Sequence, residues 1–424
     1  MPEVTLHWSG AVVGLALAIF LILKKVNAVY ALFGGAVIGG VVGGASLNET
    51  VTILIEGTKS VMPAVVRVIA AGVLAGILIE SGAAEKIAET IVDKLGENKA
   101  ILAIALATMI ITAVGVFITV SIIIVSPIAL SVARKVGISK ASVLLAILGG
   151  GKAGNMISPN PNTIAAAKGF EVDLAQVMIY GFFPALVGLI VTYILAKLLS
   201  KKGEGVKDSD IVISKHYKPS FIKAMVAPLI AILLLSLNPL GSILKVNALS
   251  SIKVDSMLIL PFAGFVGLLA MGQLKNFVAY STSGLNKMTG VAILLIGAGA
   301  IAGIISKSNL SEIVVQAIQG AGISGKLLAP IAGILMAGAA ASTTTGAILA
   351  TGTFGRAILE MGVSPLSAAV MVHTGATVID HLPHGNVFHI SSDSVKMGIS
   401  ERMKLIPYET LIGFSMTLLA TIIY

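Results

Sequence analysis

The chain has 424 residues, of which 56% are hydrophobic and only 12% are charged, and its formal net charge is +9. Soluble domains carry about 25% charged residues, so this composition excludes a soluble globular protein and indicates a polytopic protein in a lipid bilayer. The net positive charge does not indicate nucleic acid as a partner, because the basic residues lie in short loops between apolar stretches, as the positive-inside rule predicts.

Apolar stretches in the first half of the chain predict membrane spans, which take roughly 20 residues each. These spans lie near residues 9–24, 27–45, 64–80 and 174–198, with a short amphipathic stretch before the third. Residues 81–99 are amphipathic at helical spacing and predict a helix in the membrane interface. Residues 100–135 are long, apolar and interrupted at Gly115, which favours a re-entrant hairpin with its tip at 115–121 over one overlong helix. Residues 141–168 predict a broken span.

The second half repeats this order of elements. Spans are expected near 223–237, 255–272, 289–306 and 407–424, and an interfacial helix near 308–323. A second hairpin is expected at 327–361, with its tip at 340–346, followed by a broken span at 366–395. A polar segment that contains KKGEGVKDSD joins the halves. We therefore expect a first repeat at 1–200, a cytoplasmic linker at 201–222 and a second repeat at 223–424.

Two segments of the chain match in register without a gap. GVFITVS at 115–121 aligns with AASTTTG at 340–346, and Asn155 then aligns with Asp380. Five crossings and a hairpin in each half would insert the second half upside down, which is an inverted-topology repeat. The expected fold is all-α, with about ten transmembrane helices, two re-entrant hairpins and two broken helices, as in secondary transporters.

The basic clusters predict one orientation in the membrane. With the N-terminus outside, the lysine and arginine clusters that include Lys24, Arg134, Lys275 to Lys287 and Lys396 to Lys404 fall inside, and so does the linker. We expect a multi-pass protein of the cell membrane, which is the inner membrane in a prokaryote.

Hydroxyl side chains gather at the two expected hairpin tips. Free N–H groups at a helix N-terminus attract anions, and hydroxyls add donors and acceptors without a permanent charge. The alternative is that these hydroxyls bond to the preceding turn and only bend a buried helix. The candidate substrate ligands at the tips are Thr119, Ser121, Ser342, Thr343, Thr344 and Thr345.

The interruptions of the two broken spans supply further candidates. Residues 154–163 are not expected to be helical, because they contain two prolines and three asparagines, and 380–386 is the matching loop. Irregular backbone inside a membrane bundle is tolerated where it lines a cavity, although a loop packed at the protein–water interface is the alternative. The candidate substrate ligands here are Lys152, Asn155, Ser158, Asn160, Asn162 and Asn386. Lys152 either neutralises a carboxylate or extends its amine to the inner face.

Asp380 is the strongest candidate for coupling to an ion. An acid inside a membrane is costly and is a functional hypothesis by default, and histidine titrates near neutral pH. Asp380 with His381 or His384 is therefore predicted to carry a proton. A metal site at these residues is the alternative, but Pro383 disfavours helical spacing of the histidines, and we predict neither a metal nor a cofactor.

Three segments resemble the gluconate permease family, within the superfamily of ion transporters that includes citrate and dicarboxylate carriers. They are SGAAEKIA at 81–88, the Pro-Asn-Pro loop at 159–161 followed by Thr163-Ile-Ala, and DHLPHGNVFH at 380–389. The resemblance covers nearly the whole chain. It implies a scaffold domain, a transport domain that moves like an elevator, a homodimer, and uptake of carboxylates with protons. The sodium-coupled branch carries Ser-Asn-Thr motifs at its hairpin tips, whereas this chain has ITVS and STTT, which favours protons.

The leading hypothesis is a proton-coupled symporter for a small hydroxy-carboxylate such as gluconate. The alternatives within the superfamily are a sodium-coupled carboxylate symporter and a cation/proton antiporter. A passive channel would need a continuous polar pore. An enzyme would need a nucleophile–base pair or a metal set, and the sequence offers neither.

Overall fold

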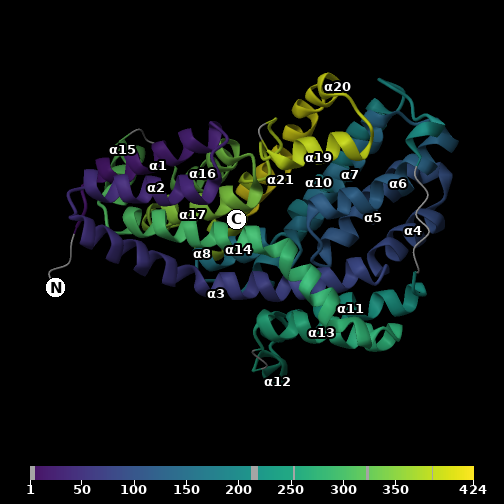
Figure 1. Cartoon of the computed structure of the whole chain (residues 1–424), viewed down its shortest axis with the longest axis horizontal. Coiled ribbons are helices and arrows are strands. Elements are labelled where there is room, and N and C mark those ends of the chain that lie inside the picture. Colours follow the sequence, from purple (N-terminus) through teal and green to yellow (C-terminus); the bar gives the residue numbers. More distant parts are fainter. Residues whose placement is uncertain (1–4, 212–217, 252–253, 321–323, 384) are drawn as a thin grey trace.

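The computed structural model describes residues 5–211, 218–251, 254–320, 324–383 and 385–424. These parts of the chain form α-helices, most of them joined by short turns (Figure 1). In the first half the helices are α1 (Trp8–Leu23), α2 (Ala28–Val42), α3 (Leu47–Glu80), α4 (Ala83–Leu95), α5 (Ala100–Ala113), α6 (Ile118–Val136), α7 (Lys140–Met156), α8 (Pro161–Gly169), α9 (Leu174–Tyr180) and α10 (Phe182–Leu199).

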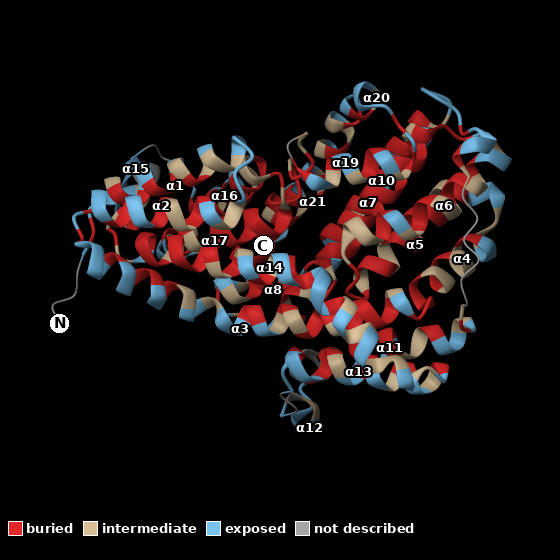
Figure 2. Ribbon diagram, in the orientation of Figure 1, coloured by how far each residue is buried: buried red, intermediate tan, exposed pale blue. Residues whose placement is uncertain are grey.

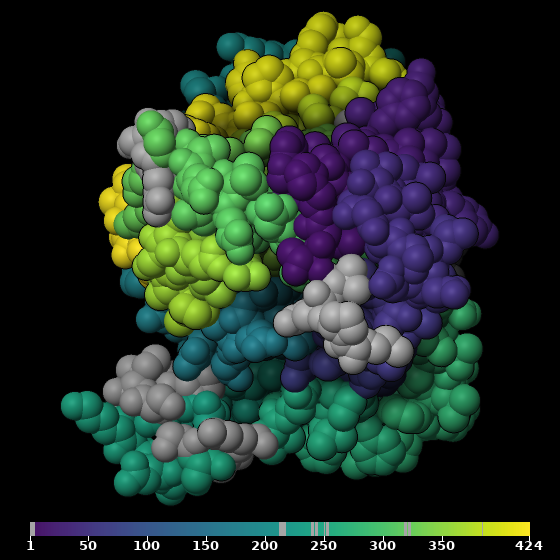
Figure 3. Space-filling view, turned by 90° about the vertical axis from the view of Figure 1, so that its left-hand side faces the viewer, coloured from purple at the N-terminus to yellow at the C-terminus, as the bar shows by residue number. Residues whose placement is uncertain are grey.

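The second half begins after the linker and follows a similar order of helices. They are α11 (Phe221–Leu244), α12 (Asn247–Ser250), α13 (Ser256–Met271), α14 (Phe277–Ser306), α15 (Leu310–Gly320), α16 (Gly325–Ala340), α17 (Thr343–Glu360), α18 (Pro365–Gly375), α19 (Asn386–Ser394), α20 (Ile399–Met403) and α21 (Ile406–Ile423). Helices of the two halves lie side by side, as the purple N-terminal helices and the green helices of the second half do in Figure 3.

Six helices in the described parts of the chain are long and apolar enough to cross a membrane, or seven if the bent pair of α4 and α5 is one span. Four further apolar helices of 15 or 16 residues are shorter than a usual span: α1, α2, α13 and α16. The all-helical class is as expected, and the count of about ten crossings stays a prediction.

Two long helices, α3 and α14, pack along each other and extend through the molecule (Figure 1). The sequence predicted a span only at 64–80, yet α3 has 34 residues and continues through Pro63. It also predicted a span from 289, yet α14 has 30 residues and begins at Phe277. These expectations were wrong because polar residues made the start of α3 look like a separate amphipathic stretch and the start of α14 look like a loop.

Glycines allow the backbones of α3 and α14 to touch. A Cβ atom at Gly57 would lie 2.2 Å from the carbonyl oxygen of Gly299, and one at Gly284 would lie 2.0 Å from that of Gly72. Small residues that permit such close approach are typical of helix packing in lipid. The contact between the two helices therefore depends on positions that accept no side chain.

Helical hairpins lie at both predicted places, over 100–136 and 325–360, and that they are re-entrant stays a prediction. The helices α5 and α6 are joined by residues 114–117, where Gly115 has a φ of 102°. The helices α16 and α17 are joined at Ala341 and Ser342, where Ala341 has a φ of 44°. Each tip therefore turns through a residue with left-handed backbone, a conformation that glycine accepts without strain and alanine does not.

Both predicted interruptions are also present, but the first is shorter than predicted. Residues 154–156 are the last turn of α7, and 161–163 are the first turn of α8, so only 157–160 are irregular. Pro161 begins α8 because its missing N–H would have had no partner in the first turn anyway. The second interruption lies between α18 and α19. The expected span at 174–198 is likewise divided, at Gly181.

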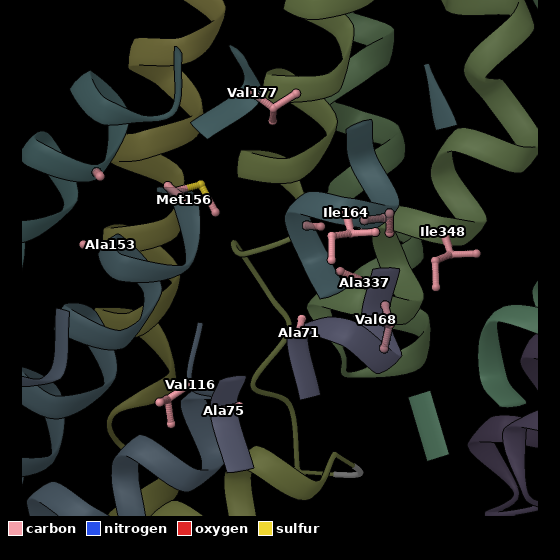
Figure 4. Packing of buried hydrophobic residues seen from close by; sticks show 14 of the residues in the cluster. Val68, Ala71, Ala75, Val116, Ala153, Met156, Ile164, Val177, Ala337 and Ile348 are labelled. Carbon is pink, nitrogen blue, oxygen red and sulfur yellow. The ribbon is translucent and has the colours of Figure 1, made fainter. Parts of the chain in front are cut away.

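Buried residues, drawn red in Figure 2, form the interior of the helical bundle. The hydrophobic ones are mainly alanine, valine, leucine and isoleucine. In Figure 4, Val68 and Ala71 of α3 lie beside Ile164 of α8 and Ala337 of α16, so the long helix packs against both the interrupted span and the hairpin. The helix α7 is buried on every side from Ser142 to Met156, which fits a helix surrounded by protein rather than lipid.

The linker between the halves is fastened to the start of α7. The Lys140 Nζ donates to the carbonyl of Lys396 at 2.9 Å and lies 3.0 Å from the Asp210 carboxylate. Burial opposes ionisation of Asp210, but hydrogen bonds from the Lys207 backbone N–H and from Lys140 keep its pKa below the ordinary value. One buried lysine thus joins three segments of the chain.

Candidate substrate site

A cavity of about 470 Å³ lies between the two hairpin tips. Its wall contains residues 117–120 of the first tip and 340–345 of the second. The start of α8 contributes Asn162, and α19 and the residue before it contribute 385–387 and Ile390. Ala28 of α2 and Lys287, Val291 and Leu294 of α14 complete it. Cavities of this volume are typical of small-molecule sites.

Seven of the predicted substrate ligands lie on this wall. They are Thr119, Asn162, Ser342, Thr343, Thr344, Thr345 and Asn386. They come from four helix starts that are distant in the sequence, so the fold brings together what the sequence presented as separate motifs.

The second hairpin tip presents a capped helix N-terminus to the cavity. The Ser342 Oγ accepts a hydrogen bond from the Thr345 backbone N–H at 3.3 Å and lies 3.1 Å from the Thr345 hydroxyl. The hydroxyl of Thr344 donates to the Asn162 side-chain oxygen, which joins this tip to α8. Free N–H groups of the first turn carry partial positive charge and suit an anion.

The first hairpin tip presents an uncapped N-terminus. Among the described residues, no side chain accepts a hydrogen bond from the first turn of α6, whose N-cap is Phe117. Thr119 lies on the cavity wall, whereas Ser121 is fully buried and its hydroxyl has no partner among the described residues. The two tips thus offer an anion two helix starts from different directions.

Behind the wall, the first interruption is tied together by its own side chains. The Asn160 Oδ1 accepts from the backbone N–H of Asn162 at 2.9 Å and of Thr163 at 3.2 Å. The Asn160 Nδ2 donates to the Asn155 Oδ1 at 3.0 Å. The hydroxyl of Ser158 is buried without a partner among the described residues. Asn155, Ser158 and Asn160 therefore support the cavity and do not line it.

A buried ion pair joins the two interrupted helices. The Lys152 Nζ donates to the Asp380 Oδ1, and to the carbonyl of Thr377 at 2.5 Å. The side chain of Lys152 is only 2% exposed. The Thr343 hydroxyl, on the cavity wall, donates to the Asp380 Oδ2 at 2.5 Å. Asp380 is thus one hydrogen bond away from the cavity.

His381 lies between this pair and a second buried pair. Its Nδ1 is 3.2 Å from the Asp380 Oδ1 and 3.9 Å from the Glu409 Oε2. Glu409 is bound by Arg402, and both are fully buried. Sequence reasoning missed the Arg402–Glu409 pair, because Arg402 stands in a cluster of charged residues at 396–404 that was assigned to the inner surface. His384 lies outside the described residues, and no group of metal-ligating side chains is found in the rest.

Lys287 is a wall residue that sequence reasoning missed. It was counted among the loop charges on the inner side, because α14 was expected to begin at 289. It lies instead within α14, where its Nζ contacts the Glu80 Oε1 at 2.9 Å and the Ser283 Oγ at 2.6 Å. The available signal was a single lysine with apolar residues after it at helical spacing.

The sequence profile of GntP family permeases matches residues 6–424 of the chain. The chain belongs to the GntP family of permeases. It is 53% identical to an uncharacterized transporter of Haemophilus influenzae, over 98% of this chain and 97% of that protein. It is 23% identical to a high-affinity gluconate transporter of Escherichia coli, over 88% of each chain.

Two solved structures share the fold of this GntP-family permease. The YdaH transporter of Alcanivorax borkumensis matches with a TM-score of 0.65 at 16% identity, over 89% of this chain and 88% of that one. The MtrF protein of Neisseria gonorrhoeae matches with a TM-score of 0.56 at 12% identity, over 96% and 94%. Together with the apolar helices, these relatives identify the GntP-family permease as a multi-pass membrane transporter and not an enzyme.

Proposed function

We propose that this permease is a proton-coupled symporter of a small hydroxy-carboxylate, with gluconate as the first candidate. The observation that carries the proposal is the hydroxyl-lined cavity between the hairpin tips, joined to Asp380 through Thr343. The E. coli relative named as a high-affinity gluconate transporter supports this substrate class.

The chemistry of the wall suits a sugar acid. The side chains of Thr119, Ser342, Thr345 and Asn386 would exchange hydrogen bonds with the hydroxyls of the substrate. The N-termini of α6 and α17 would stabilise its negative charge.

Protonation of Asp380 would couple the proton to the substrate. While Asp380 is ionised, the Thr343 hydroxyl donates its hydrogen to the Asp380 Oδ2, and the carboxylate balances the positive charge of Lys152. A protonated Asp380 could donate to the Thr343 oxygen, and the hydroxyl hydrogen of Thr343 would then be free to bind the substrate. Lys152 would meanwhile lose its counter-ion, so the site would favour an anion only after it had taken up a proton.

Lys152 also supports a proton over sodium as the coupling ion. Its ammonium group occupies one carboxylate oxygen of Asp380 and would repel a sodium ion at that place. A proton needs no such space, since it can bind to an oxygen of the carboxylate directly.

We extend the proposal to the architecture. The repeated order of helices supports an inverted repeat of residues 1–200 and 223–424 around the linker at 201–222. The long helices α3 and α14, with their close glycine contacts, are suited to a scaffold, and the hairpins with the interrupted helices to a transport domain that moves like an elevator in a homodimer.

Uptake of labelled gluconate into proteoliposomes tests the function. We expect an inward proton gradient to drive accumulation and an inward sodium gradient to have no effect. In Asp380→Asn, and in Lys152→Met/Asp380→Asn, gradient-driven accumulation is lost, while exchange against gluconate inside the vesicles continues. Uptake driven by sodium, or proton-driven uptake that survives both variants, contradicts the proposed coupling.

A further inference from the structure

We propose that Lys287 of α14 binds the carboxylate of the substrate, and that Glu80 of α3 occupies Lys287 while the cavity is empty. This inference rests on the proposed function and deepens it, because it assigns the substrate charge to a residue outside the hairpins and the interrupted helices.

Lys287 is the charged residue on the cavity wall, among the wall residues that the structure describes. Its side chain is 31% exposed and lies on the cavity wall. Lys152, the other lysine considered for this role, is 2% exposed and bound to Asp380. A substrate carboxylate in this cavity therefore meets Lys287 and not Lys152.

The present partner of Lys287 is itself a carboxylate. The Glu80 Oε1 lies 2.9 Å from the Lys287 Nζ and accepts a hydrogen bond from the Ser283 hydroxyl at 2.6 Å. Glu80 is the last residue of α3, and its side chain is 36% exposed. Partly exposed ion pairs are weak, so a carboxylate that also binds the hydroxyl-rich tips can displace Glu80.

Apolar side chains share the cavity wall with Lys287. Val291 and Leu294 follow it on the same helix, and Phe117 and Ile118 belong to the first tip. A carboxylate bound among apolar side chains is shielded from water, which strengthens its attraction to the ammonium group. Since Lys287 belongs to α14 and the hydroxyls to other helices, the substrate would bridge the two groups of elements.

The absence of cysteine from the natural chain allows a direct test. In purified Lys287→Cys, we expect the Kd for labelled gluconate to rise about tenfold, because the substrate loses one charge-assisted hydrogen bond. Reaction with 2-aminoethyl methanethiosulfonate rebuilds a positive charge and should restore most of the affinity. The negatively charged sulfonatoethyl reagent should not. Gluconate, but not the neutral polyol glucitol, should slow both reactions.

Two companion variants separate binding from structure. In Glu80→Gln the competitor for Lys287 is removed, so we expect the Kd for gluconate to fall about threefold, opposite in direction to the change in Lys287→Cys. Lys404→Cys serves as the matched control, because Lys404 pairs with Glu401 at 2.5 Å on an exposed surface away from the cavity. Its affinity for gluconate should be the same before and after reaction with either reagent.

The outcomes distinguish this inference from the proposed function. If the wild type binds gluconate and Lys287→Cys binds it equally well, the inference is overturned and the proposed function stands. Weaker binding in both Glu80→Gln and Lys287→Cys, without rescue by the amine reagent, means a structural pair and also overturns it. If Lys287→Cys does not fold, the direction of the change in Glu80→Gln decides. A wild type that binds no carboxylate in a panel of sugar acids overturns both proposals.

Discussion

Lys152 of α7 and Asp380, between α18 and α19, form an ion pair that joins the two interrupted helices. Lys152 also donates to the carbonyl of Thr377, which lies 225 residues further along the chain and is the residue that aligns with Lys152 in the repeat. The interruptions that match in sequence are therefore in direct contact. An acid and a base that neutralise each other inside a bundle can be separated only at a large electrostatic cost, because each charge would be left buried without its partner.

Loss of one partner of this pair should destabilise the protein. Lys152→Met leaves the buried Asp380 carboxylate without its cation, and we expect a loss of about 3–5 kcal/mol in stability. The double variant Lys152→Met/Asp380→Asn removes both charges and should recover most of that loss. Thermal unfolding of the purified protein measures both. Equal stability of the single and double variants would show that the charges are not coupled.

The hydroxyl of Thr343, and not its methyl group, should be needed to couple proton movement to uptake. Thr343→Val removes the hydrogen bond to Asp380, and we expect proton-driven uptake to fall about tenfold, since hydrogen bonds to charged groups contribute about 1.5–3 kcal/mol. Thr343→Ser keeps the hydroxyl and should stay close to the wild type. The measurement is the initial rate of uptake under a proton gradient, and a serine variant as impaired as the valine variant would contradict this role.

Adding a single methyl group at Gly284 should disrupt the contact between α3 and α14 and destabilise the protein. In Gly284→Ala the new Cβ would lie 2.0 Å from the Gly72 carbonyl oxygen, so we expect a loss of about 1–3 kcal/mol. Gly290→Ala is the matched control on the same helix, because its Cβ would meet nothing within 4 Å, and it should stabilise the helix by up to about 1 kcal/mol. Melting temperatures that move in the same direction in both variants would refute this account.

Asp210, in the linker, should make the folded protein less stable at acidic pH. The pKa of Asp210 is lowered in the folded protein, so its ionised form favours folding above the ordinary pKa of about 3.9, and this contribution disappears as the pH falls through the lower folded value. In Asp210→Asn this part of the pH dependence should be absent. Thermal unfolding of both proteins from about pH 6 to pH 3 checks the prediction. A steeper acid dependence in the variant would reverse the assigned sign.

Local chemistry explains which elements could be predicted from the sequence. The first tip contains Gly115, whose left-handed backbone is a turn signal in itself. The second tip turns at Ala341, which carries no such signal, and only its alignment with the first tip revealed it. The interruption before α8 was predicted too long, because Pro161 was taken as a helix breaker although it begins the helix.

Apolar stretches, their repetition and the polar breaks within them determined that this protein is an all-helical membrane transporter with two hairpins, because these features depend on neighbouring residues. Only the tertiary structure decided which charges meet. Lys152 and Asp380 belong to different halves, and Lys287 contacts Glu80 across two helices. Pairing between distant residues depends on how the helices pack. That packing depends on close backbone contacts such as those at Gly57 and Gly284. The hydrophobic pattern along the chain does not show which helices make these contacts.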